Sequence, residues 1–161
     1  MHAVGALAHR AITHIPDEAQ ELFINLPHLD LGHNALTAVP AWFSCLQPLG
    51  VLVLAHNQLS MIPEGVGSLD GLTKLDLSHN SLTALPEIIK WTLLQDFNVC
   101  NNLLTKLPDM HLLASLTELS IQSNRLTSFP CSVGELKSLV RLTAQENQVR
   151  FVFLSVLWCL Y

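Results

Sequence analysis

Residues 49–59 read LGVLVLAHNQL, in which Leu49, Leu52, Leu54, Asn57 and Leu59 follow the spacing Leu-x-x-Leu-x-Leu-x-x-Asn-x-Leu. This spacing occurs six times between residues 26 and 149, with other apolar residues at some leucine positions. The asparagines of the six copies lie 23, 23, 22, 22 and 23 residues apart, at Asn34, Asn57, Asn80, Asn102, Asn124 and Asn147. A repeat of this length predicts a solenoid in which each copy forms one coil.

Each copy predicts one short strand and one return segment. The Leu-x-Leu alternation has a period of two, which places both leucines on the buried face of a strand. Successive strands must be parallel, because about a dozen residues separate them where a hairpin needs only a few. Five copies continue after the turn with a proline, which suits the start of a helical or extended segment: Pro40, Pro63, Pro86, Pro108 and Pro130.

The return segments carry apolar residues of their own, which we expect to face inward: Val66 and Leu69, Ile89 and Trp91, Leu112 or Leu113, and Val133 and Leu136. Their spacing is that of one face of a short helix or an extended turn. The predicted fold class is therefore α/β, with an open parallel sheet and short helical or 3-10 return segments.

The chain opens within a partial repeat. Residues 7–10 align with residues 31–34, which puts Arg10 where the other copies have asparagine. We expect about six full repeats plus this partial one, in a repeat domain of residues 1–150. An asparagine amide offers both a donor and an acceptor, so the six asparagines predict a ladder between neighbouring turns. The ladder should fail at Arg10 and leave the first repeat frayed.

The composition excludes several classes of protein. Of the 161 residues, half are apolar and 13% are charged, which is too hydrophobic for a disordered chain. The net charge of −5 argues against a nucleic-acid-binding protein. The longest apolar run, residues 151–161, is shorter than the roughly 18 to 20 residues that cross a bilayer. Four scattered cysteines and the lack of an Asn-x-Ser/Thr sequon favour a reducing, cytoplasmic setting.

The repeats resemble the leucine-rich-repeat superfamily. The forms at residues 59–69 and 126–136 are similar to the 23-residue intracellular class found in Ras-suppressor-like and Roco-type proteins. This resemblance implies a right-handed arc with a concave parallel sheet, and a module that binds other proteins through that face. Small GTPases and phosphatase subunits are the partners that the family analogy suggests.

The strand positions that face away from the core predict the binding surface. Stacking turns each such position into a row of side chains across the sheet. An open arc of this kind favours protein recognition over a small-molecule pocket. The candidate residues on the concave face are Asp30, His33, His56, Lys74, Asp76, His79, Asp96, Asn98, Glu118, Ser120, Gln122, Arg141, Thr143 and Gln145.

One row is rich in histidine: His9, His33, His56 and His79. Stacked imidazoles are possible metal ligands, but no acidic or cysteine ligand joins this row, so we expect no metal site. A pH response of a partner interface is the better interpretation, because histidine titrates near neutral pH.

The chain also has no phosphate-binding loop, nucleophile elbow or zinc-protease motif. We therefore expect no enzyme activity, no catalytic residues and no cofactor.

Residues 151–161 break the pattern. They read FVFLSVLWCLY, without the polar outer face that a terminal coil needs. Three interpretations stay open: truncation of a longer repeat protein, which we favour, insertion of the tail into a partner, and capping of the core. An apolar end of this kind is also a surface for self-association.

The sequence favours a protein-protein interaction module that acts as an intracellular adaptor or regulator. The alternative is a truncated repeat fragment of a larger signalling protein, such as a Roco-type GTPase and kinase, without independent activity.

Overall fold

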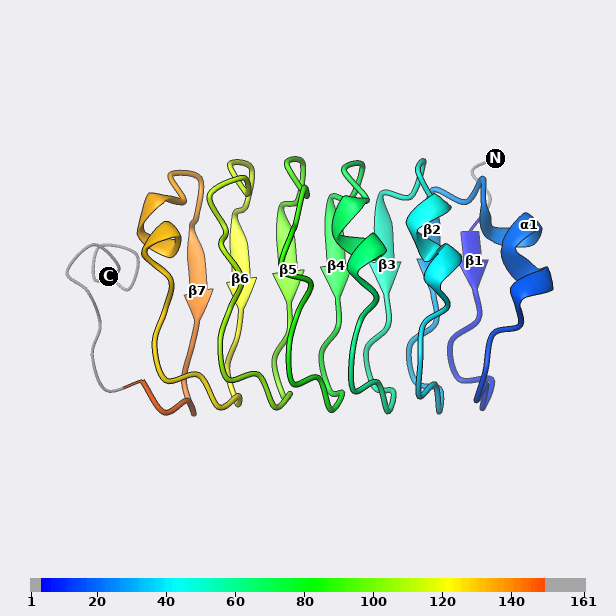
Figure 1. Ribbon diagram of the computed structural model, residues 1–161, viewed down its shortest axis with the longest axis horizontal. Coiled ribbons are helices and arrows are strands. Elements are labelled where there is room, and N and C mark those ends of the chain that lie inside the picture. The colour runs from blue at the N-terminus through cyan, green and yellow to red at the C-terminus, as the bar shows by residue number, and fades with distance from the viewer. Residues whose placement is uncertain (1–3, 150–161) are drawn as a thin grey trace.

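The structure is a computed structural model and describes residues 4–149. It contains a single sheet of seven parallel strands, which pair in chain order along an elongated arc (Figure 1). The predictions for residues 151–161 lie outside the described residues, and the domain limit at residue 150 stays a prediction. The strands are β1 (Val4–Ala6), β2 (His28–Asp30), β3 (Val51–Val53), β4 (Lys74–Asp76), β5 (Asp96–Asn98), β6 (Glu118–Ser120) and β7 (Arg141–Thr143).

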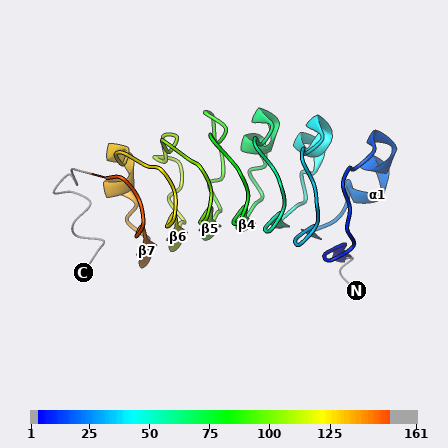
Figure 2. The same ribbon diagram turned by 90° about the horizontal axis from the view of Figure 1, so that it is seen from below.

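The return segments lie on the opposite side of the coils from the strands. Figure 2 shows the sheet along the concave side of the arc and the helical segments along the convex side. These segments are η1 (Asp17–Ala19), α1 (Gln20–Phe23), η2 (Ala41–Cys45), η3 (Glu64–Ser68) and η4 (Cys131–Glu135). All but α1 are 3-10 helices, so the predicted parallel sheet with short return segments is confirmed. Among residues 4–149, none of the helices has the length and apolar character needed to cross a bilayer.

One narrow core runs between the two sides of the coils. The strand leucines Leu52, Leu75 and Leu119 have no exposed surface. The predicted inward residues of the return segments meet them from the convex side, and all of those predicted in pairs are buried. Of the two alternatives in the fifth copy, Leu113 is buried and Leu112 is exposed.

Within residues 4–149, two coils lack a helical return segment. The turns at Asn80, Asn102 and Asn124 are only 22 residues apart, and no 3-10 helix forms between them, whereas all the 23-residue spacings contain one. A 3-10 helix advances about 2.0 Å per residue and an extended chain about 3.3 Å per residue. A return segment with one residue fewer must therefore extend to reach the next strand in register.

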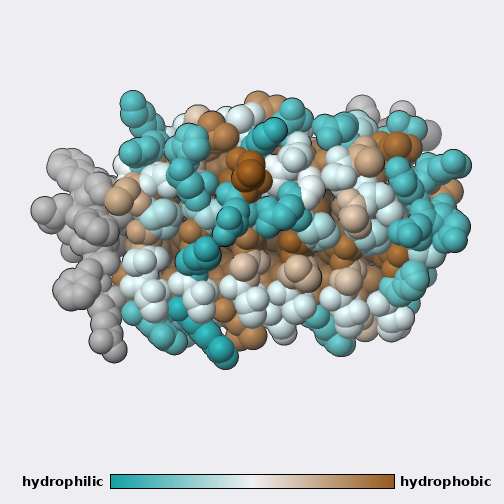
Figure 3. Space-filling view, viewed as in Figure 1, coloured by the Kyte–Doolittle hydropathy of each residue, from teal (hydrophilic) through white to brown (hydrophobic). Residues whose placement is uncertain are grey.

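The extended return segments leave apolar side chains uncovered. Ile88, Leu93 and Leu112 all belong to the two shorter coils and are among the exposed large hydrophobic residues. Figure 3 views the convex face, where brown hydrophobic atoms lie among polar ones near the middle. Trp91 is fully buried in the same region, and its indole Nε1 donates to the carbonyl of Val66 at 2.9 Å.

The asparagine ladder is confirmed. Asn57 Oδ1 accepts from the backbone N–H of Leu36 at 2.9 Å, in the preceding coil. Its Nδ2 donates to the carbonyl of Leu31 in the preceding coil and to the carbonyls of Leu54 and Ala55 in its own coil. The other five asparagines bond in the same way, so each amide joins its own turn to the one before it.

The prediction that the ladder fails at Arg10 is wrong. Asn34 Oδ1 accepts from the backbone N–H groups of Arg10 and Ile12, both at 3.0 Å, and its Nδ2 donates to the carbonyl of Leu7. Each asparagine serves the coil before it, so the first coil needs no asparagine of its own. An asparagine at position 10 would bond to a coil on the N-terminal side. Arg10 therefore does not weaken the bonds between its own coil and the coil of Asn34.

Removal of one ladder amide should destabilise the fold strongly. Asn57 is buried, and Asn57→Ala leaves the backbone groups of Leu36 and Leu31 without this partner, at roughly 1–3 kcal/mol for each buried group. We expect the free energy of unfolding in urea to fall by about 2–4 kcal/mol. Gln58→Ala, at the exposed neighbouring position, is the control and should change little. Equal stability of the two variants would contradict the role of the ladder.

Gly67 marks a close approach between a 23-residue coil and a 22-residue coil. Gly67 lies in η3, and its carbonyl accepts a hydrogen bond from Lys90 N at 2.7 Å. A Cβ at this position would collide with the carbonyl oxygen of Ile88. Gly67→Ala should therefore lower the free energy of unfolding by about 1–3 kcal/mol. Gly50→Ala is the matched control, because its Cβ would meet no atom closer than 3.5 Å. A Gly67→Ala variant as stable as Gly50→Ala would show that the backbones can separate without cost.

Candidate functional site

The parallel register aligns the outward-facing strand residues in two rows. The first runs through His28, Val51, Lys74, Asp96, Glu118 and Arg141. The second runs through Asp30, Val53, Asp76, Asn98, Ser120 and Thr143. The sequence alignment of the copies therefore gives the correct pairing at every strand, and the concave candidates on the strands lie side by side as expected. Their role in binding stays a prediction.

The charged residues of the first row form ion pairs across neighbouring strands. Lys74 Nζ lies 2.6 Å from Asp96 Oδ2, and Arg141 lies 3.3 Å from Glu118. The hydrogen bond to Asp96 raises the pKa of Lys74, with smaller contributions from the charges of Asp96, Asp76 and Glu118. The sequence alignment of the copies indicates these two ion pairs, because it places opposite charges at adjacent positions of the row.

Three candidates in the second row have a local structural role that the sequence pattern did not indicate. Asp30 Oδ1 accepts from the backbone N–H of Gly32 at 2.9 Å. Asp76 Oδ1 accepts from both the backbone N–H and the hydroxyl of Ser78, at 3.0 and 2.7 Å. Asn98 Oδ1 accepts from the backbone N–H of Cys100 at 3.1 Å. These side chains stabilise the end of their strands by bonding two residues ahead, as Asp and Asn do in turns.

Surface character changes along the sheet. Val51 and Val53 on β3 form a half-exposed apolar patch between the polar residues of β2 and β4. Toward the C-terminal end, Ser120, Gln122 and Thr143 are half-buried, and Gln145 is exposed. The face therefore has an apolar patch at β3 with polar residues on both sides of it, and it has no enclosing wall.

The histidine strip, defined as His9, His33, His56 and His79, occupies one backbone position in four successive coils. Each residue has a left-handed conformation, with φ between 52° and 57°. Asn101, Ser123 and Glu146 have the same conformation in the next three coils. The strip therefore lies at the sharp turn after each strand, next to the ladder asparagines. Histidine and asparagine are among the residues that tolerate this region best.

The imidazole rings of the strip stack face to face. The centroids of successive rings are 4.2, 4.1 and 4.0 Å apart, with interplanar angles of 14°, 13° and 10°. Parallel rings direct their nitrogens side by side, whereas a shared metal ion needs ligands that converge on it. Within residues 4–149, no group of three or more His, Cys, Asp or Glu side chains is placed to hold a metal ion.

A second polar cluster lies on a return segment and was not predicted. His111 Nδ1 is 2.8 Å from Asp109 Oδ2, and both side chains are exposed. A hydrogen bond from Ser132 is the main cause of the lowered pKa of Asp109, followed by bonds from the backbone and side chain of His111. The hydroxyl of buried Ser132 also accepts from Met110 N at 2.9 Å. The Ser132 hydroxyl thus bonds to the backbone of the turn and the His111 imidazole bonds to Asp109, which is the arrangement of a turn rather than of an activated nucleophile.

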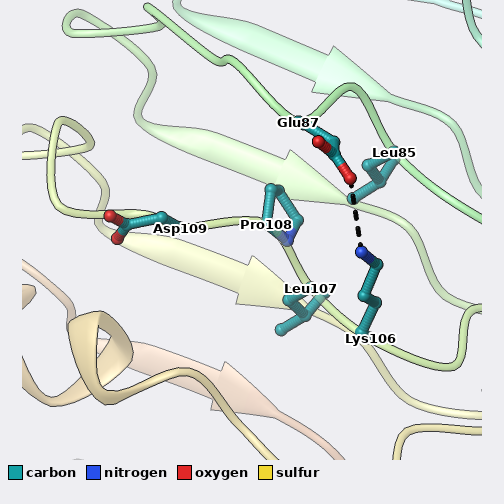
Figure 4. A pocket seen from close by; sticks show the side chains of 6 residues that line it. All are labelled: Leu85, Glu87, Lys106, Leu107, Pro108 and Asp109. Atoms are coloured by element: carbon teal, nitrogen blue, oxygen red, sulfur yellow. Dashed lines mark hydrogen bonds and ion pairs between the residues drawn. The ribbon is translucent and has the colours of Figure 1, made fainter.

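A shallow hollow lies between the segments that leave the turns at Asn80 and Asn102 (Figure 4). It measures about 250 Å³ and is lined by Leu85, Glu87, Lys106, Leu107, Pro108 and Asp109. Glu87 and Lys106 form an ion pair of 3.4 Å across it. Both charged side chains are mostly exposed to solvent, so they do not form a closed site for a small molecule.

Comparisons with known proteins agree with the repeat architecture. Two family models, both described as leucine-rich repeat, match residues 6–59 and residues 71–91 and 115–136, together more than half of the chain. A leucine-rich-repeat protein of Leptospira interrogans is 27% identical, with a TM-score of 0.79 over 92% of this chain and 44% of that one. The leucine-rich-repeat domain of the type III effector XopL is 24% identical, with a TM-score of 0.76 over 86% of this chain and 51% of that one.

The chain spans about half the length of these solved structures. A sequence comparison with curated proteins found no match. The comparisons do not distinguish between classes within the superfamily, so the similarity to the Ras-suppressor-like and Roco-type class stays a prediction.

The bonds at the strand ends predict a difference between two substitutions of one residue. Asp76→Ala removes the acceptor for Ser78 and should lower the free energy of unfolding by about 1 kcal/mol. Asp76→Asn keeps an acceptor oxygen, as Asn98 does for Cys100, and should change stability by less than about 0.5 kcal/mol. Urea unfolding of both variants distinguishes the contribution of the hydrogen bond to stability from that of the charge. Equal loss in both would mean that the negative charge, not the bond, stabilises the turn.

Proposed function

The chain belongs to the leucine-rich-repeat superfamily, and we propose that it acts as an adaptor or regulator that binds another protein through its concave face. Leucine-rich-repeat domains typically bind proteins. The observation that carries the proposal is the register of the five strand pairings from β2 to β7. It places twelve outward-facing side chains from β2 to β7 on one continuous, accessible surface.

The chemistry of this surface suits a protein partner. The apolar side chains of Val51 and Val53 lie beside charged and amide groups, which is the mixture found in protein interfaces. The binding contacts are proposed to come from the strand rows together with Gln122, Gln145 and the histidine strip. We propose that the module works by binding rather than catalysis. Small GTPases and phosphatase subunits are candidate partners by family analogy.

We propose a cytoplasmic location. Cys45, Cys100 and Cys131 are free thiols in the structure. Free cysteines persist in the reducing cytosol, whereas secreted domains usually pair them. The lack of an Asn-x-Ser/Thr sequon agrees with this location.

Charge reversal on the concave face tests the proposal. The double variant Asp96→Lys and Glu118→Lys breaks both ion pairs of the first row. Exposed ion pairs contribute only about 0.2–1 kcal/mol, so the variant should still fold. Affinity capture followed by quantitative mass spectrometry identifies the proteins that bind the wild-type chain. We expect the double variant to recover at least tenfold less of these proteins, which corresponds to a loss of about 1.4 kcal/mol of binding energy.

The matched control is Asp70→Lys with Glu135→Lys. Both residues are exposed and lie on return segments, and the change in net charge is the same. The control should recover the same proteins as the wild type. If the two double variants recover equal amounts of every protein, the concave face is not the binding surface. Circular dichroism of all three chains checks that the comparison is between folded proteins.

A further inference from the structure

The stacked rings of the histidine strip form a continuous column of four titratable groups. Each inner ring, His33 and His56, faces a neighbouring imidazole on both sides at 4.0–4.2 Å. Each outer ring faces one. Such a column is stable with neutral rings, because a proton on an inner ring would bring its charge close to two other sites that also bind protons.

The backbone beneath the rings is held separately from them. The backbone N–H of His33, His56 and His79 each donates to a carbonyl of the following coil at 2.9 Å. The neighbouring asparagine amides hold the same turns through the ladder. The ring stack is therefore an added layer on a fixed backbone, and the rings can separate while the turns stay paired.

The charged groups around the strip are few. Asp30 lies near His33 and Asp76 lies near His56, and each carboxylate favours the protonated ring. Arg10 follows His9 in the chain and is exposed. Beyond His79 the next residue of the row is Asn101, whose Nδ2 lies 3.4 Å from His79 Nε2. That contact is a hydrogen bond when Nε2 is the unprotonated acceptor, and so it also favours a neutral ring.

We propose that the histidine strip is an acid-sensitive switch, in which the four rings stack when neutral and separate when the inner rings are protonated. The change converts a flat, uncharged column at the turn edge of the sheet into separate cations beside Asp30 and Asp76. It alters the shape and charge of the rim of the concave face without unfolding the coils. The switch does not depend on the identity of a partner.

The pKa values give the sign of the effect. Desolvation lowers the pKa of both His33 and His56, and the charges of neighbouring histidines lower it further. Asp30 and Asp76 act in the opposite direction and offset part of this shift. The unfolded chain then binds protons more readily than the folded chain below the ordinary histidine pKa of 6.5. The stabilisation is complete above that pH and is lost as the pH falls through 6.5 toward the lower folded pKa values.

Nuclear magnetic resonance of the whole chain tests the switch directly. The nuclear Overhauser contacts between ring protons of successive histidines should be present at pH 7.5 and lost once His33 and His56 are protonated. In the variant His33→Asn with His79→Asn, the titration midpoint of His56 should shift upward, because both neighbouring rings are gone. Asparagine suits the backbone, since Asn101 has the same conformation with φ 54°. Ring contacts that persist at acid pH, or an unchanged His56 midpoint, would overturn the proposal.

A second measurement uses stability. Between pH 7.5 and 5.5, the wild-type chain should lose more free energy of unfolding than the double variant His33→Asn with His56→Asn. His14→Asn with His28→Asn is the matched control, because it removes two histidines and leaves the strip intact. The control should follow the wild type. If the strip variant and the control show the same dependence on pH, the stack is not the acid-sensitive element.

Discussion

Each ladder asparagine binds the backbone of two coils at once, and the rest of the structure depends on this bond. A parallel coil turns sharply at the end of its strand, where N–H and C=O groups leave the sheet without partners. Asn102 accepts from Leu82 N of the preceding coil and donates to Leu77 O of that coil and to Val99 O of its own. The amide therefore satisfies the turn and sets the position of one coil on the next.

The ladder fixes the register, and the register makes the surface. Because each turn is bonded to the one before it, every strand starts at the same height, and residues at one repeat position stand next to each other across the sheet. Variation on the convex side does not disturb this order. The two coils with 22-residue spacing lose their 3-10 segment, yet Asp76 still pairs with Asn98, and Asn98 with Ser120. The return segments adjust by extending, and they leave Ile88 and Leu93 exposed as the result.

The sequence predicts those parts of the molecule that depend on the period. The core leucines, the strand register and the ladder all repeat, so one copy informs the others. The features that sequence analysis missed are set by local geometry within a coil. The bond that Ser78 donates to Asp76 depends on the backbone direction after the strand. The direction of the ladder, in which Asn34 serves the coil containing Arg10, depends on the three-dimensional stacking of the turns.

In each turn, the fold requires a left-handed backbone conformation at the histidine position, but it does not require a particular side chain there. Ser123 and Glu146 occupy the same position in later coils and adopt nearly the same φ as the histidines, at 53° and 56°. The backbone conformation there carries a steric cost for any residue with a Cβ, and the surrounding hydrogen bonds impose it regardless of the side chain. The fold therefore does not require histidine at this position. The four histidines in successive coils therefore determine the chemistry of the surface. The coils hold these rings in place, but their fold does not depend on the protonation of the rings.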